Sequence, residues 1–299
     1  MIKLNRRQII LIITAIAIII LLSITIFNLM NKNNIENGIW VNSYSMEKID
    51  MDKLSKYGIE NIFLHSSAVD KYGKEKVGAW VAKAKAKNIT VHIWVQCFYS
   101  DGKWVNPIDT KKKDFNYDHF NKKLKDINRY MEVPGIGGIQ LDYIRYPGNA
   151  YKYDYPAGVT GTNAVNKFVS MVSGSINNKN LTLSIDVMPE VEGAKYYGQD
   201  IGALSYYADV IIPMAYVGNY KQDETWIKDI SEYFKKKSGF AHVCIGIQDY
   251  VSDSNLSSLS SKKLEKNSKA AIEGGADGVA IFNFEHLENY FDMRTLKKK

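Results

Sequence analysis

The feature that most constrains the fold is a repeated pattern in which a short apolar segment is followed by a turn and an amphipathic helix. The apolar segments hold few polar residues, as expected of strands buried on both faces of a parallel sheet. Eight such units run from residue 38 to residue 292, and a TIM barrel typically takes about 250 residues. The sequence therefore predicts an α/β fold with a single (β/α)₈ barrel. The predicted strands are Gly38–Asn42, Asn61–Ser66, Thr90–Phe98, Gly138–Tyr143, Leu181–Met188, Val210–Tyr216, His242–Gln248 and Gly278–Phe284.

The segments between the predicted strands have the apolar periodicity of helices that cover a sheet. Glycine or asparagine follows several of them, where a helix C-terminus is expected. The predicted helices are Met51–Tyr57, Lys74–Lys87, Tyr117–Tyr130, Asn163–Ile176, Ile201–Tyr207, Thr225–Lys237, Ser261–Glu273 and a last one at Leu287–Phe291.

An open, doubly wound sheet is the main alternative, because it shows the same alternation of strands and helices. Such a sheet would carry a glycine-rich phosphate turn after its first strand. Here the first strand runs into Trp40–Tyr44, and the G-x-G-x-x-G pattern occurs nowhere in the sequence. The closed barrel is therefore the favoured fold.

An uncharged, apolar run precedes the barrel. Ile9–Met30 is 22 residues long, and a helix needs roughly 20 residues to cross a bilayer. The run lacks the small-residue cleavage site of a secretory signal peptide, and positive charge lies mainly before it. We therefore expect a cytoplasmic N-terminus (1–8), a transmembrane signal anchor (9–30), a linker (31–37) and a barrel domain (38–299) on the extracellular side of the cell membrane.

Composition limits the partners of the chain. Its net charge of +7 comes mainly from lysines that are spread along the helices or gathered in short runs. Nucleic-acid readers usually show an arginine-rich stripe or a known motif, so we expect no nucleic-acid partner. Diffuse lysine suits a protein near an anionic membrane or wall polymer. Cys97 and Cys244 could form a disulfide in an oxidising compartment, but two buried free thiols are the favoured interpretation. We expect a monomer without metal or cofactor.

Candidate catalytic residues lie at the ends of the predicted strands. TIM barrels build their active sites at the C-terminal ends of the strands. Asp142 ends the fourth strand and Asp186 lies in the fifth, while Asp249 and Glu285 follow the seventh and eighth. Hydrolysis of a glycosidic bond uses two carboxyl groups: one protonates the leaving oxygen, and the other attacks or activates water. We predict Asp142 and Asp186 as this pair, with Glu285 and Asp249 in reserve.

Other polar and aromatic residues share these strand ends and could bind a sugar. Several also have structural readings: Asp142 could pair with Arg145, Glu190 and Glu285 could cap helices, and Asp249 could belong to a turn. The patterns G-x-S-x-G and H-E-x-x-H are absent from the sequence, which argues against acyl-enzyme and zinc hydrolases. The predicted substrate-binding residues are Arg145, Tyr216, Gln140, Trp94, Gln96, His65 and Glu190.

Four ordered motifs resemble those of a family of glycosyl hydrolase domains found in bacteria and archaea. Gly138–Pro147 resembles the strand-four signature G-I-Q-F-D-Y-I-R-F-P of that family, and Ser184–Val187 resembles its strand-five motif. Gly198–Ile201 and Ala208–Tyr216 are similar to two later segments. The resemblance implies a TIM barrel that acts on a sugar polymer.

A more distant similarity links the chain to family 18 chitinases. Asp142 and Tyr216 correspond to residues of their strand-four and strand-six motifs, but Ile144 and Arg145 stand where those enzymes have the catalytic Glu. The bacterial and archaeal family also tends to have a His after strand six, which this chain lacks at Val217–Asn219. We therefore weigh two functions. One is a membrane-anchored glycoside hydrolase acting on cell-wall or surface polysaccharide. The other is a barrel that binds surface glycan, for attachment or scaffolding, without cleaving it.

Overall fold

The computed structural model divides the chain into two compact units, Met1–Asn34 and Ile35–Lys299. The predicted transmembrane segment 9–30 and the linker 31–37 lie almost wholly outside the described residues. Within the described part of the chain, no helix is both long and apolar enough to cross a bilayer. The structure describes residues 37–100, 102–177 and 179–296, together with Arg7, Thr14, Ile16 and Ile18.

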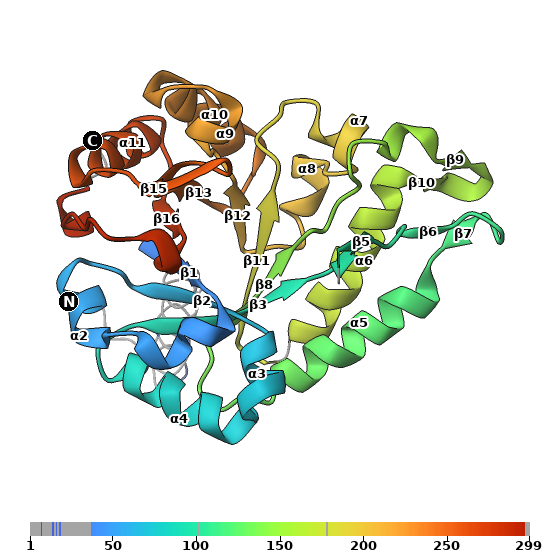
Figure 1. Cartoon of the computed structure of the whole chain (residues 1–299). Coiled ribbons are helices and arrows are strands. Elements are labelled where there is room, and N and C mark those ends of the chain that lie inside the picture. The colour runs from blue at the N-terminus through green and yellow to red at the C-terminus, as the bar shows by residue number, and fades with distance from the viewer. Residues whose placement is uncertain are drawn as a thin grey trace. The chain divides into compact units, whose positions relative to one another are not determined.

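The second unit is built on a closed barrel of parallel strands (Figure 1). Its strands are β1 (Asn37–Val41), β2 (Asn61–His65), β3 (Thr90–Gln96), β8 (Gly138–Asp142), β11 (Thr182–Val187), β12 (Val210–Pro213), β13 (His242–Gln248) and β16 (Gly278–Phe282). They follow one another around the barrel in the order β1-β16-β13-β12-β11-β8-β3-β2. The predicted TIM barrel and all eight of its strands are therefore confirmed.

Helices surround the strands (Figure 1). Several begin at a side chain that accepts a hydrogen bond from the first turn, as Asn116, Thr160 and Ser260 do, which satisfies backbone N–H groups that the helix itself leaves free. The α-helices are α2 (Met51–Lys56), α3 (Ser67–Tyr72), α4 (Lys74–Lys85), α5 (Tyr117–Tyr130), α6 (Gly161–Ile176), α7 (Gly193–Tyr197), α8 (Ile201–Leu204), α9 (Val217–Tyr220), α10 (Glu224–Lys237) and α11 (Ser261–Glu273). Short 3₁₀ turns are η1 (Ser43–Lys48), η2 (Ala150–Lys152), η3 (Pro156–Gly158), η4 (Phe284–His286) and η5 (Met293–Thr295).

The predicted last helix, Leu287–Phe291, is wrong. The chain leaves η4 at Leu287 with extended backbone angles (φ −79°, ψ 92°), and no helix forms before η5. Leu287 and Phe291 are nevertheless both buried in the core. An irregular segment can thus bury two apolar side chains that have helical spacing.

Two apolar layers hold the barrel together. Inside it, Trp40, Phe63 and Trp94 pack with smaller side chains of β12, β13 and β16. A larger cluster fills the space between the strands and the helices. Successive side chains of a strand point to opposite faces, so each strand contributes to both layers. Cys97 and Cys244 are buried free thiols, as predicted.

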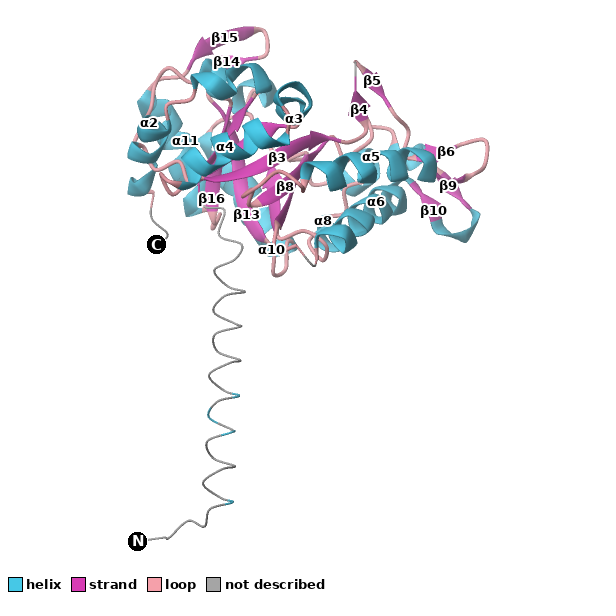
Figure 2. Cartoon of the chain, turned by 90° about the horizontal axis from the view of Figure 1, so that it is seen from below, coloured by secondary structure: helices cyan, strands magenta, loops and turns pink. Residues whose placement is uncertain are grey.

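Short hairpins that the apolar pattern of the sequence does not predict extend the loops that follow the strands. One group, β6–β7 and β9–β10, lies at one edge of the domain beyond α5 and α6 (Figure 2), where Ile108, Val159 and Ala164 form a small apolar cluster. The hairpins are β4 (Tyr99–Ser100) with β5 (Lys103–Trp104), β6 (Ile108–Asp109) with β7 (Asp114–Phe115), β9 (Asp154–Tyr155) with β10 (Val159–Thr160), and β14 (Tyr250–Ser252) with β15 (Asn255–Ser258).

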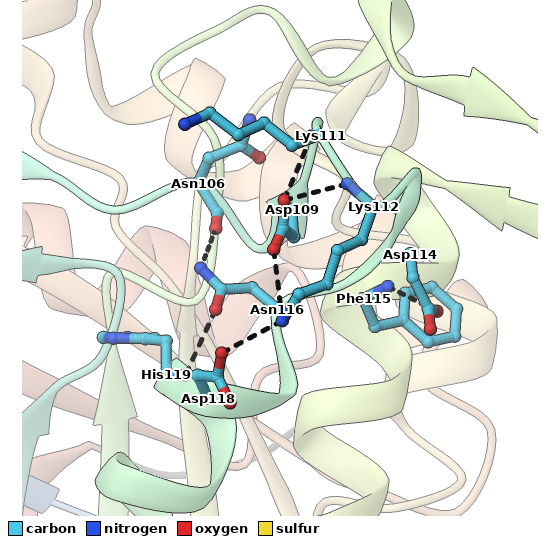
Figure 3. A network of polar contacts seen from close by, with 9 residues as sticks. All are labelled: Asn106, Asp109, Lys111, Lys112, Asp114, Phe115, Asn116, Asp118 and His119. Atoms are coloured by element: carbon cyan, nitrogen blue, oxygen red, sulfur yellow. Dashed lines mark hydrogen bonds and ion pairs between the residues drawn. The ribbon is translucent and has the colours of Figure 1, made fainter.

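A polar network fixes the long loop between β3 and α5 (Figure 3). Asn116 Nδ2 donates to the carbonyl of Asn106 (2.9 Å), and Asn116 Oδ1 accepts from the backbone N–H of His119 (3.1 Å). Asp109 Oδ1 accepts from the backbone N–H groups of Lys111 and Lys112. Asn116 therefore joins the start of α5 to the loop that carries the hairpins.

Removing this link should destabilise the fold. We expect Asn116→Ala to lower the free energy of unfolding by about 1–2 kcal/mol, because the helix loses its N-cap acceptor. Asn116→Ser keeps an N-cap acceptor but loses the hydrogen bond to Asn106, so it should lower the free energy of unfolding less than Asn116→Ala does. Urea unfolding of the three proteins measures this, and equal stabilities of the wild type and Asn116→Ala would contradict the assigned role.

Candidate active site

A cavity of about 420 Å³ opens at the C-terminal ends of the barrel strands. Six of the predicted site residues line it: Asp142, Asp186, Arg145, Tyr216, Trp94 and Gln96. The remaining lining residues are Trp40, Tyr143, Met188, Met214, Asn219, Tyr220, Tyr250, Asp253 and Phe282. Aromatic residues are the most numerous class in the wall, and two buried carboxyl groups, Asp142 and Asp186, face the cavity.

Asp142 and Asp186 lie side by side across two neighbouring strands. β8 and β11 pair in parallel, with Leu141 opposite Ile185, so the next residue of each strand is a carboxylic acid. Both side chains point into the barrel, because side chains alternate along a strand. The fold therefore brings the predicted catalytic pair to one place.

The carboxyl group of Asp142 is almost completely buried and accepts two N–H groups. Trp94 Nε1 donates to Oδ2 (3.0 Å), and the backbone N–H of Tyr143 donates to Oδ1 (2.6 Å). Burial raises the pKa of Asp142, while these two donors and the nearby Arg145 oppose the rise. The donors therefore favour the ionised form of this carboxyl group.

Asp186 is buried, and its hydrogen-bond donors, Gln140 and Trp40, are neutral. Gln140 Nε2 donates to Asp186 Oδ1 (3.0 Å), and Gln140 Oε1 accepts from Trp40 Nε1 (2.8 Å). Burial, and next to it the charge of Asp142, raise the pKa of Asp186 well above its ordinary value. Gln140 is fully buried beneath the cavity and orients Asp186, so its predicted contact with substrate is replaced by a positioning role.

The two carboxyl groups thus have different environments. Two carboxylates that share a buried site repel each other, and one of them retains its proton. Burial and the charge of Asp142 raise the pKa of Asp186 well above its ordinary value, so Asp186 keeps the proton and Asp142 carries the charge. Such a pair can supply an acid and an anion to one bound molecule.

Tyr216 lies close to both carboxyl groups, in the short segment between β12 and α9. Its ring stacks on Phe282, with centroids 5.4 Å apart and planes inclined by 22°. Burial, then Asp186 and Asp142, raise the pKa of Tyr216 well above its ordinary value. The phenol therefore stays neutral and can donate a hydrogen bond into the cavity.

Arg145 belongs to an aromatic wall and does not form the ion pair with Asp142 that the sequence left open. Its Nη1 donates to the carbonyl of Tyr146 (3.2 Å), and its guanidinium lies 4.7 Å from the ring centroid of Trp104 and 5.3 Å from that of Tyr143. Tyr143 in turn stacks on Tyr99 (4.8 Å). Tyr99 and Trp104 belong to the loop that the Asn116 network holds, so that loop supports this wall.

The two reserve carboxylates lie outside the cavity lining. Glu285 accepts from both the backbone N–H and the side-chain amide of Asn42 (3.0 and 2.9 Å), which ties η4 to the end of β1. Asp249 is fully buried and accepts from the backbone N–H of Asn283 (3.0 Å). Cys244 of β13 points into the barrel. Because side chains alternate along a strand, Asp249, five positions later, points outward. Both residues therefore have structural contacts in place of the predicted position in the site.

His65 and Glu190 also lie outside this cavity. His65 Nδ1 is 2.7 Å from Ser67 Oγ, and the His65 ring contacts Trp94 edge-on with centroids 4.8 Å apart. His65 therefore supports Trp94, which lines the cavity. Burial lowers the pKa of His65, which favours the neutral ring. Glu190 Oε1 accepts from the hydroxyl groups of Tyr197 (2.9 Å) and Tyr220 (3.1 Å).

A second cavity of about 400 Å³ adjoins the first. Tyr220 lines both, and its ring lies against that of Trp226 with centroids 5.2 Å apart. Glu190 Oε2 is buried here without a hydrogen-bond partner. The second cavity is also lined by Pro189, Val191, Glu192, Tyr196, Gln222 and Ile230.

Some lining residues that were not among the predicted site residues are nevertheless indicated by the alternation of side chains along the strands. Trp40, Met188, Met214 and Phe282 occupy alternate positions along strands, in phase with other inward side chains, and could have been found by extending that alternation. Tyr143 and Asp253 lie outside helices and strands, Asn219 and Tyr220 belong to α9, and Tyr250 begins β14, so the alternation along the barrel strands could not have identified them. Among the described residues, no group of three or more His, Cys, Asp or Glu side chains could hold a metal ion.

Comparison with known proteins agrees with this architecture. Residues 70–236, more than half of the chain, match the family described as "Putative glycosyl hydrolase domain", and the chain belongs to that family. No curated protein matches the chain in sequence.

Solved structures of glycoside hydrolases share the fold. The glycoside hydrolase domain of PgaB (BpsB) from Bordetella bronchiseptica is similar with a TM-score of 0.66 and 10% identity, over 88% of this chain and 98% of that one. A chitinase from Chromobacterium violaceum gives 0.59 and 12%, over 83% and 93%. An endo-1,4-beta-D-mannanase from Thermotoga petrophila gives 0.58 and 12%, over 84% and 88%. At such identities the likeness establishes the fold.

Asp249 should make stability depend on pH. Burial raises the pKa of Asp249 to about 7 from its ordinary 3.8, so the folded chain holds a proton that the unfolded chain releases. The protonated Asp249 carboxyl group makes its full contribution to the free energy of unfolding below pH 4. This contribution is lost as the pH rises to 7. Relative to Asp249→Asn, the wild type should lose about 1.4 kcal/mol per pH unit over this range.

Urea unfolding at several pH values measures this difference. Asp229→Asn, at an exposed position of α10, is the matched control and should differ from the wild type by a constant amount. A constant difference for Asp249→Asn as well would show that Asp249 ionises normally.

Proposed function

We propose that this protein is a glycoside hydrolase that cleaves a cell-wall or surface polysaccharide by acid and base chemistry at Asp142 and Asp186. One observation carries the proposal: two adjacent, buried carboxyl groups face one aromatic cavity at the mouth of the barrel. Glycosidic hydrolysis needs two such groups in different protonation states. Membership of a glycosyl hydrolase domain family supports the same reaction.

In the proposed mechanism, Asp186 is the acid. Its carboxyl proton passes to the glycosidic oxygen as the bond from that oxygen to the anomeric carbon breaks. The Asp142 carboxylate, held by Trp94 and the Tyr143 backbone, stabilises the positive charge that develops on the sugar ring. A water molecule then forms a bond to the anomeric carbon and gives a proton to Asp142, and transfer of this proton to Asp186 restores the starting state. Tyr216 donates a hydrogen bond to the same ring region. Gln140 holds Asp186 in position from below.

The aromatic lining supports a carbohydrate substrate, because sugar rings stack on aromatic faces. The second cavity supports a polymer in particular. It continues from the first across Tyr220, and Trp226 and Tyr196 offer further ring surfaces. We propose that a glycan chain extends from the carboxyl pair into this second cavity, where Glu190 Oε2 accepts a sugar hydroxyl.

We further propose that residues 9–30 anchor the protein, as a monomer, in the cell membrane with the barrel outside. The support is the sequence: an uncharged apolar run of sufficient length with basic residues before it. An outward-facing barrel would meet surface polysaccharide directly.

Substitution of either carboxyl group should abolish most activity. We expect Asp142→Asn and Asp186→Asn each to lower kcat by about 10²–10⁴-fold, the usual contribution of a positioned acid or base. Release of reducing ends from purified wall and capsular polysaccharides measures this. Glu285→Gln, outside the cavity, is the matched control and should retain activity.

A full-rate Asp142→Asn enzyme would refute the assignment. Glycan binding by the wild type without release of reducing ends from any polymer would support the glycan-binding scaffold. The replacement of the family's His by Val217–Asn219 is the feature in favour of that alternative.

The dependence of activity on pH should reflect both raised pKa values. Activity needs Asp142 ionised, so kcat/KM should rise as pH passes its raised pKa. It also needs Asp186 protonated, so kcat/KM should fall above the still higher pKa of that group. A bell-shaped profile of kcat/KM displaced upward from the ordinary carboxyl range is expected. A profile that is flat from pH 4 to 8 would contradict the proposed acid and base.

A further inference from the structure

The end of the barrel opposite the cavity carries two unusually exposed aromatic side chains. Phe240 is 106% exposed and Tyr206 is 85% exposed. Phe240 precedes β13 and Tyr206 precedes β12, and these strands pair in parallel with Val210 opposite His242. The two aromatic residues therefore lie on neighbouring loops at the N-terminal ends of the strands.

Three exposed lysines belong to the same end of the barrel. Lys236 and Lys237 end α10 just before the turn that carries Phe240, and Lys179 precedes β11, the strand beside β12. Lys235, by contrast, is engaged with Asp277 (2.5 Å). We call Lys179, Tyr206, Lys236, Lys237 and Phe240 the basal patch.

The composition of the basal patch matches one kind of partner. Exposed aromatic side chains insert among lipid headgroups, and lysines are attracted to anionic lipids. Phe240 follows Gly239, whose positive φ of 55° forms a tight turn. A ring projecting from such a turn, with lysines beside it, is suited to the surface of an anionic bilayer.

Chain connectivity brings the same end of the barrel toward a membrane. All strands of a parallel barrel start at one end, so the residues before Asn37 enter the domain at the end that carries the basal patch. If residues 9–30 span the bilayer, residues 31–36 can extend at most about 20 Å. The bilayer surface is then within reach of this end.

We propose that the basal patch docks on the anionic lipid surface of the membrane that holds the N-terminal segment. This inference rests on the proposed anchoring. Docking there directs the cavity, at the other end of the strands, away from the lipid and toward external polymer. The anchor alone would leave the barrel free to turn, whereas docking fixes its direction.

A fluorescent reporter at the patch tests the docking. Full-length chain carrying Tyr206→Cys is labelled with an environment-sensitive fluorophore and placed in phosphatidylcholine nanodiscs with or without phosphatidylglycerol. Cys97 and Cys244 are buried and should remain unlabelled. The matched control is a label at Leu256→Cys, an exposed apolar position on β15 near the cavity.

We expect a blue shift and quenching by lipid-bound quenchers at position 206 but not at 256, stronger with phosphatidylglycerol. Adding Phe240→Ser, or Lys236→Gln with Lys237→Gln, should reduce both signals. Identical spectra at the two positions in both lipids would overturn the proposal. A blue shift at 206 without lipid quenching would also overturn it and would indicate a protein contact.

Extraction of membranes with alkaline carbonate separates this proposal from the anchoring on which it rests. Release of the chain by carbonate would refute the anchor. Retention of the chain together with a water-like spectrum at position 206 would leave the anchor standing and refute the docking.

Discussion

Closure of the parallel barrel is the constraint on which the rest of the structure depends. Closure aligns the C-terminal ends of all eight strands in one ring and forces alternate side chains into a small interior. Asp142 and Asp186 occupy adjacent inward positions at the end of β8 and β11. The same packing of Trp40, Phe63 and Trp94 that fills the barrel also excludes water from beneath these carboxyl groups. Their chemistry is thus a consequence of how the barrel closes.

Burial of the two acids has a thermodynamic consequence for the fold. Raised pKa values mean that ionising these groups is harder in the folded chain than in the unfolded one, so they oppose folding at neutral pH. The surrounding donors offset part of this cost: Trp94 and the Tyr143 backbone at Asp142, and Gln140 and Trp40 at Asp186. The site is maintained because apolar packing inside the barrel and between the strands and the helices holds β8 and β11 in place.

The two ends of the barrel have different surfaces, and each suits a different proposed partner. The C-terminal end has two aromatic cavities joined at Tyr220, which suit a glycan chain. The N-terminal end has a fully exposed phenylalanine and three exposed lysines, which suit a lipid headgroup layer. An enzyme held between a membrane and a polymer needs both contacts on opposite faces, and a TIM barrel provides opposite faces through the common direction of its strands.

The sequence by itself determined the eight strands and the pairing of Asp142 with Asp186, because period-two and period-3.6 patterns are local and strand ends converge in any parallel barrel. It could not place Asp249 and Glu285, which stand at similar strand ends but face the outer layer and Asn42. It also missed the hairpins and loop aromatics, such as Tyr99 and Trp104 behind Arg145, and mistook Leu287–Phe291 for a helix. Those features depend on contacts between segments far apart in the chain, and only tertiary packing decides where a loop or an acid just past a strand end will point.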